Sequence, residues 1–135
     1  MDIINNIGRL LEKYWNLFLV GTGNTLLLSA ITVFLGIIIG SLLALMRISK
    51  LKVGNCRPLN LIATIYVEII RGTPLLLQLF FFYFGLTYVT LPNGESITLS
   101  MFTAAVISFV LNYAAYFAEI FRGGIIGVSK GQYEA

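Results

Sequence analysis

Residues 14–46, YWNLFLVGTGNTLLLSAITVFLGIIIGSLLALM, form an unbroken run without a charged side chain. Two further uncharged runs follow, at residues 72–94 and 96–118. Each run is longer than the ~20 apolar residues that a helix needs to cross a bilayer. In a chain of 135 residues, three such runs leave too little other sequence to bury them in a soluble core. The sequence therefore predicts an all-α membrane protein with three transmembrane helices.

The overall composition agrees with a multi-pass membrane protein. Hydrophobic residues make up 58% of the chain and charged residues 11%, whereas soluble proteins carry ~25% charged residues. Asp2 and Glu12 offset the basic residues at the start of the chain, and no small-residue cleavage site follows a short apolar core. We therefore expect no secretory signal and a first span that is retained.

The sequence offers no candidate constellation of residues for catalysis or metal binding. Histidine is absent and Cys56 is the single cysteine, so we expect no metal site and no disulfide within the chain. No glycine-rich loop followed by Lys and Ser or Thr is present to hold nucleotide phosphates. The sequence predicts a protein that is not an enzyme. Its net charge of +3 is uninformative as a total, because in a membrane protein the placement of Lys and Arg matters more than their sum, and nucleic-acid binding is not indicated.

The N-terminal segment, residues 1–18, is amphipathic. One side of the expected helix carries charged and amide side chains. The apolar side chains recur at helical spacing on the other side, at Ile3, Ile4, Ile7, Leu10, Leu11, Tyr14 and Phe18. This pattern predicts a helix that lies in the membrane interface, and a continuation of the first span is the alternative. We expect residues 19–135 to form the transmembrane domain.

The first span covers residues 22–46 and has a face of small side chains. Thr32, Gly36, Gly40 and Ala44 lie four residues apart, so another helix can approach closely there. Packing within the chain and contact with a second subunit both fit this pattern.

The basic residues predict the orientation. Arg47, Lys50, Lys52 and Arg57 crowd into the first connection, while the next connection, residues 91–97, carries only Glu95. Because Lys and Arg favour the cytoplasmic side, we expect an outside N-terminus, an outside turn at residues 91–94 and a cytoplasmic C-terminus.

The second span, residues 59–91, is interrupted at residues 72–74. Pro74 has no amide proton and crowds the carbonyl of Ile70, so we expect a broken or kinked helix. Glu68 and Arg71 share a helical face, which predicts either a structural ion pair or a switchable link to a partner.

The third span, residues 97–121, confines its small, polar and charged groups to one stripe. The stripe contains Ala105, Ser108, Asn112, Ala115, Glu119 and Arg122. Asn112 needs a hydrogen-bonding partner in a membrane, so it either links helices or, with Ser108, lines a polar translocation path.

Three motifs in order closely resemble the polar amino-acid ABC transporter permeases, the histidine/glutamine/arginine/opine family. Residues 66–80, YVEIIRGTPLLLQLF, resemble the second-span signature of this family. Residues 21–26, GTGNTL, are similar to its opening, and residues 113–124, YAAYFAEIFRGG, to its third-span ending. The matched signature residues are Glu68, Arg71, Gly72, Thr73, Pro74, Gln78, Glu119, Arg122 and Gly123.

The last residues, VSKGQYEA at 128–135, are similar to the approach to the family's EAA loop, which couples a permease to its ATPase. The resemblance assigns this coupling role to Gly131, Gln132, Glu134 and Ala135. It covers the N-terminal portion of a family member, so we expect three of five spans, with the sequence stopping at the start of the EAA loop.

The resemblance implies a type I, binding-protein-dependent importer of a polar amino acid in the cytoplasmic membrane. It implies four kinds of partner: a second permease subunit in a homodimer or heterodimer, a cytoplasmic ABC ATPase dimer that binds ATP and Mg, an extracytoplasmic solute-binding protein, and the lipid bilayer. No cofactor is expected on this chain. The alternative function is a non-transporting membrane adaptor or a degenerate fragment of such a permease.

Overall fold

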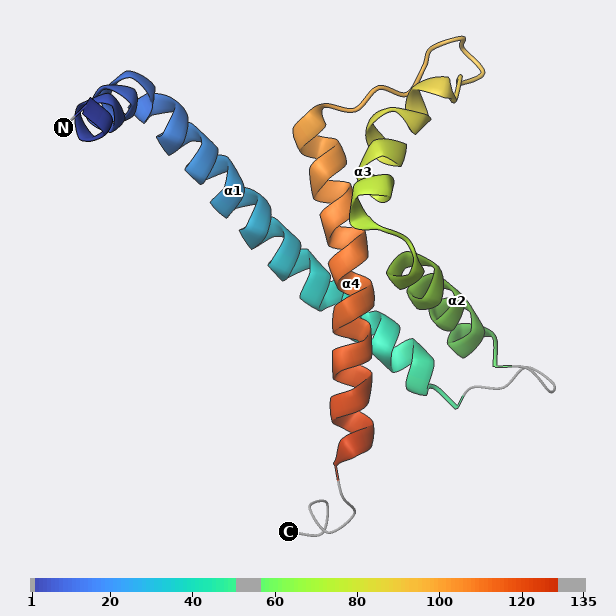
Figure 1. Cartoon of the computed structure of the whole chain (residues 1–135). Coiled ribbons are helices and arrows are strands. Elements are labelled where there is room, and N and C mark those ends of the chain that lie inside the picture. Colours follow the sequence, from blue (N-terminus) through green and yellow to red (C-terminus); the bar gives the residue numbers. More distant parts are fainter. Residues whose placement is uncertain (1, 51–56, 129–135) are drawn as a thin grey trace. The chain divides into compact units, whose positions relative to one another are not determined.

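The computed structural model describes residues 2–50 and 57–128, and these residues are mainly helical (Figure 1). Its elements are α1 (Asp2–Ile48), α2 (Pro58–Gly72), α3 (Leu75–Tyr83), the 3-10 helix η1 (Gly85–Tyr88) and α4 (Met101–Gly127). Within these ranges no strand is formed, apart from an isolated bridge between Thr90 and Ser96. Two compact units, residues 1–30 and 31–135, are described separately below.

Two of the described helices are long and apolar enough to cross a membrane, Asn6–Ile48 and Met101–Gly127. A third span results if the pair Pro58–Gly72 and Leu75–Tyr88, which is bent by 99°, counts as one. The all-helical class and the predicted break at residues 72–74 are thus confirmed, whereas the count of three spans stays a prediction.

In the unit of residues 1–30, α1 is helical from Asp2 onward without a break at residue 18. The ammonium group of Lys13 lies 5.3 Å from the centre of the Tyr14 ring, and Trp15 is exposed. The hydroxyl of Thr25 donates to the carbonyl oxygen of Gly21. A helix fits both the interfacial segment and the continued span, so this alternative stays open.

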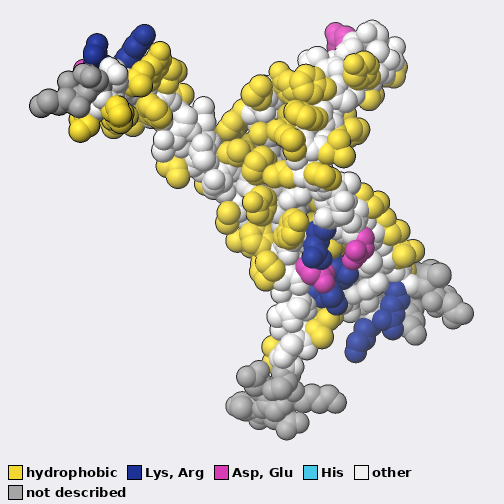
Figure 2. Space-filling view, viewed as in Figure 1, with side chains coloured by type: hydrophobic (Ala, Val, Ile, Leu, Met, Phe, Trp, Pro, Cys, Tyr) yellow, Lys and Arg dark blue, Asp and Glu magenta, His cyan; other side chains and the backbone are white. Residues whose placement is uncertain are grey.

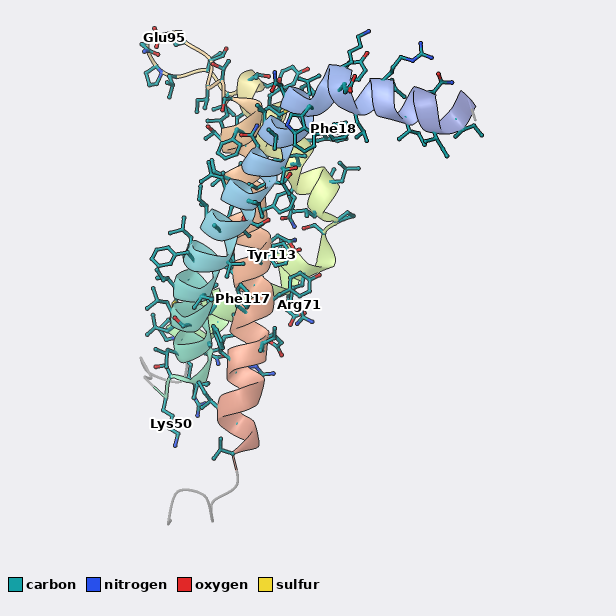
Figure 3. All side chains as sticks on the ribbon, turned by 90° about the vertical axis from the view of Figure 1, so that its left-hand side faces the viewer. Phe18, Lys50, Arg71, Glu95, Tyr113 and Phe117 are labelled. Atoms are coloured by element: carbon teal, nitrogen blue, oxygen red, sulfur yellow. The ribbon has the colours of Figure 1, made fainter. Side chains whose placement is uncertain are left out.

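In the unit of residues 31–135, the small face of α1 packs against α4. Thr32, Gly36, Gly40 and Ala44 are all buried. A Cβ added to Gly36 would lie 3.2 Å from ring carbons of Phe117, the side chain that Figure 3 labels on α4. The small residues therefore serve packing within the chain, and they let the α1 and α4 backbones approach.

A second contact joins α2 to α4. Val67 of α2 is fully buried against Ala115 and Ala118 of α4. The hydroxyl of Tyr66 reaches across to donate to the carbonyl oxygen of Leu111 at 2.8 Å. Small residues on α4 thus allow both α1 and α2 to pack closely against this one helix.

The turn predicted at residues 91–94 is present between η1 and α4. The N–H of Gly94 donates to the carbonyl oxygen of Leu91 at 2.8 Å, and Gly94 has a φ of 83°. Glycine adopts this left-handed conformation without steric cost. Ser100 then caps α4 by accepting from the N–H of Thr103, so the helix begins at Met101 and continues to Gly127, beyond the predicted residue 121.

Candidate functional site

The break between α2 and α3 is the first part of the candidate site. α2 ends at Gly72, Thr73 is extended with φ −108° and ψ 137°, and α3 begins after Pro74. A residue before proline is pushed out of the helical region, and proline cannot donate to the carbonyl four residues earlier. The sequence therefore both ends α2 here and leaves the Ile70 carbonyl without its helical donor.

Gln78 supplies the missing donor. Its amide nitrogen lies 2.9 Å from the carbonyl oxygen of Ile70, 2.8 Å from the hydroxyl oxygen of Thr73 and 3.2 Å from the Thr73 carbonyl oxygen. The Thr73 hydroxyl also lies within hydrogen-bond distance of the carbonyl oxygens of Ile69 and Ile70. The backbone polarity that Pro74 exposes is thus satisfied inside the chain, as a membrane interior requires.

Asn112 connects this break to α4. Its side-chain amide donates to the side-chain oxygen of Gln78 at 3.3 Å, and Asn112 and Gln78 are 6% and 7% exposed. Ser108, one turn earlier on α4, is fully buried and donates to the carbonyl oxygen of Ala104. Asn112 therefore links two helices, while Ser108 is satisfied by its own helix.

The second part of the candidate site is a group of charged side chains, which we call the arginine cluster: Arg47, Glu68, Arg71, Glu119 and Arg122. It lies where the C-terminal end of α1 meets α2 and α4. Figure 2 shows it as one dark-blue and magenta group. Glu119 is its centre. Arg122 donates to Glu119 at 2.7 Å, Arg47 donates to the same carboxylate, and a guanidinium nitrogen of Arg71 lies 3.9 Å from it.

Arg47 and Glu119 are the two least exposed members of the cluster. The Arg47 side chain is 9% exposed and that of Glu119 is 29% exposed. Burying a charge is expensive unless an opposite charge compensates for it. The side-chain amide of Asn60 also donates to the Arg47 carbonyl at the end of α1. Three helices are thereby held together around one carboxylate.

The predicted pairing of Glu68 with Arg71 is not found among the described ion pairs. Glu68 lies 4.0 Å from Arg47 with 68% of its side chain exposed, while Arg71 lies beside Glu119 with its guanidinium 5.5 Å from the centre of the Tyr116 ring. Figure 3 shows Arg71 beside α4. Helical spacing predicted that the two residues share a face, but charges on α1 and α4 compete for each of them. The pair Glu119 and Arg122 is present.

The remaining predicted site residues are placed as follows. Gly72 and Gly123 are exposed, and a Cβ at either would meet nothing within 4 Å. Pro74 is the N-cap of α3. The predicted coupling residues Gly131, Gln132, Glu134 and Ala135 lie outside the described residues. Among residues 2–50 and 57–128, no three His, Cys, Asp or Glu side chains gather as a metal site would require.

The chain is similar to several transport proteins. Over 120 residues it is 48% identical to the putative glutamine transport system permease protein GlnP of Rickettsia typhi, covering 88% of this chain and 50% of that protein. It is 41% identical over 117 residues to the arginine transport system permease protein ArtQ of Bacillus subtilis, covering 87% and 49%. No family model matches the chain.

A solved structure agrees with these relatives. The crystal structure of an amino acid ABC transporter with histidines matches with a TM-score of 0.77 and 40% identity, covering 92% of this chain and 53% of that chain. The chain is therefore a homologue of the amino-acid ABC transporter permeases and a multi-pass membrane protein. It spans about half the length of the relatives that it matches.

Proposed function

We propose that this protein is a membrane-spanning permease subunit of an ATP-driven amino-acid importer. The observation that carries the proposal is the match to an amino acid ABC transporter, at 40% identity over 92% of this chain. Relatives named for glutamine, arginine and L-cystine transport support a polar amino acid as the proposed substrate class. The broken helix supports the same function, because discontinuous membrane helices are common parts of transporters.

The proposed orientation is an outside N-terminus and a cytoplasmic C-terminus in the cytoplasmic membrane. Arg47 at the end of α1 and Arg122 near the end of α4 meet at Glu119, so these two helix ends lie on the same side. Lys50 and Arg57 flank the connection that follows. Basic residues favour the cytoplasmic face, which supports placing the arginine cluster there.

The proposed partners are a second permease subunit, an ATPase dimer that binds ATP and Mg, and an extracytoplasmic solute-binding protein. Residues Gly131, Gln132, Glu134 and Ala135 would begin the segment that contacts the ATPase. ATP-driven closure would then rock the spans as rigid bodies and alternate their access. We place the translocation path along the polar stripe of α4, near Ser108 and Asn112.

Reconstitution of the complete transporter tests this function. The permease, its ATPase and its solute-binding protein are assembled in liposomes, and uptake of radiolabelled glutamine, arginine and cystine is measured with ATP or with a non-hydrolysable analogue. We expect uptake of a polar amino acid that requires both ATP hydrolysis and the binding protein. An assembled complex that takes up no amino acid under these conditions would favour the adaptor function instead.

A further inference from the structure

Gln78 is the point at which α2, α3 and α4 are joined by hydrogen bonds. Its amide nitrogen donates to the end of α2, at Ile70, and to Thr73 in the break. Its side-chain oxygen accepts from Asn112 of α4. Both polar atoms of this buried side chain therefore form hydrogen bonds, which join α3 to α2, to the break and to α4.

The backbone at the break does not by itself determine the angle between α2 and α3. Only Thr73 and Pro74 separate the two helices, and both have extended ψ angles of 137° and 136°. No helical hydrogen bond to the Ile70 carbonyl is available from Pro74. A junction of this kind is a hinge unless side chains restrain it.

The side chains around the break are mainly apolar. The break borders an open cavity of about 450 Å³ lined by Ile69, Ile70, Thr73, Leu77, Gln78, Phe81 and Phe82. Thr73 and Gln78 are the polar side chains in this lining, and Thr73 is itself part of the break. Both α2 and α3 also pack against α4, but apolar contacts are not directional. The amide of Gln78 therefore adds a directional restraint at the 99° bend itself.

We propose that Gln78 is a positioning residue for transport. It holds the break between α2 and α3 at one angle and ties that break to α4 through Asn112, so that the three helices move as one body when access alternates. This inference rests on the proposed transport function, and it assigns Gln78 no contact with substrate.

The test uses the complete transporter with Gln78→Met, which keeps an unbranched side chain of similar length and removes both polar atoms. The matched control is Leu76→Met, on the same helix but with a side chain 60% exposed. Spin labels replace Ile62 on α2 and Phe81 on α3, both of which are exposed, after Cys56 and any other cysteine have been changed to serine. The distance distribution between the labels is measured together with KM and the maximal rate of uptake.

We expect Gln78→Met to broaden the distance distribution. It should lower the maximal rate about tenfold, because losing a buried hydrogen bond costs about 1.4 kcal/mol, which corresponds to a factor of ten. KM should change by less than about twofold. Leu76→Met should behave as wild type. Asn112→Leu should keep the narrow distribution, since the donors to Ile70 and Thr73 remain, and should still lower the rate. If Gln78→Met does not reach the membrane, Thr73→Val removes the hydroxyl that accepts from the Gln78 amide and should broaden the distribution in the same way.

A wild-type distance distribution in Gln78→Met would overturn the proposal, and so would a broadened distribution with an unchanged rate. A raised KM with a narrow distribution would assign Gln78 to substrate contact instead. If the wild-type complex does not transport, the proposed function fails, whereas the distance measurement still decides whether Gln78 holds the bend.

Discussion

Replacing Gly40 by alanine should destabilise the contact between α1 and α4. A Cβ added there would lie 2.6 Å from the Cβ of Phe117, 3.0 Å from the carbonyl oxygen of Ala114 and 3.2 Å from the nitrogen of Ala118. Carbon atoms normally approach to about 3.5–4.0 Å, so the two helices have to separate by on the order of 1 Å. Two of the three crowded atoms belong to the backbone, and no rotamer change relieves them.

The expected magnitude follows from two opposing effects. Overpacking a well-packed contact costs about 1–3 kcal/mol, while alanine in a helix interior is favoured over glycine by about 0.5–1 kcal/mol. The net effect is therefore a loss of about 0–2.5 kcal/mol in the free energy of unfolding, and the contact of 2.6 Å with the Phe117 Cβ places Gly40→Ala in the upper half of this range. Gly36→Ala should cost less, because the Cβ would meet ring carbons of Phe117 at 3.2 Å and a ring can shift.

Thermal unfolding of the purified protein in detergent measures this effect, with Gly23→Ala as the matched control. Gly23 lies in the same helix, and a Cβ there would meet nothing within 4 Å. The expected order of stability is Gly23→Ala, at or above wild type, then Gly36→Ala, then Gly40→Ala. A Gly40→Ala protein as stable as the Gly23→Ala control would refute the close packing of α1 on α4.

Three further predictions concern the polar groups. Glu119→Gln leaves Arg47, whose side chain is 9% exposed, with only the carboxylate of Glu68 at 4.0 Å. It should lower the free energy of unfolding by on the order of 3 kcal/mol, whereas Glu68→Gln, at a side chain 68% exposed, should change it by less than about 0.5 kcal/mol. Equal losses in a denaturation assay would contradict the central place of Glu119. Tyr66→Phe removes the hydrogen bond to Leu111 and should cost about 1 kcal/mol in the same assay, while Tyr88→Phe, at a residue 87% exposed, should have no measurable effect. Asn112→Leu leaves the Gln78 oxygen without its donor and should slow amino-acid uptake in the reconstituted transporter, by about tenfold if the lost bond is worth about 1.4 kcal/mol; unchanged uptake and assembly would remove Asn112 from the candidate site.

The break in the second span shows what local sequence can and cannot predict. Pro74 predicts the interruption because its missing N–H and its ring act on the residues immediately around it. The donor that replaces that N–H is the side chain of Gln78, whose position depends on how α3 leaves the break. No periodicity in the sequence identifies Gln78, and only the family resemblance singled it out.

The charged residues also show which contacts local sequence can predict and which depend on the fold. Glu119 and Arg122 lie three residues apart on α4 and form an ion pair, since no other helix is needed to bring them together. The same rule was wrong for Glu68 and Arg71, because Arg47 of α1 and Glu119 of α4 lie within reach of them. Arg47 itself was interpreted from the sequence only as an orientation signal, and its buried pairing with Glu119 came from the fold.

By itself the sequence determined three features: the membrane-spanning class, the position of the helix break, and which helix faces are small or polar. It could do so because bilayer thickness, proline geometry and helical period act on consecutive residues. The tertiary structure decided which partner each of those faces and charges meets. It placed the glycine face of α1 on Phe117, Asn112 on Gln78 and three arginines around Glu119. These contacts join residues from different helices, so they depend on how the helices pack, and helical period alone does not specify that packing.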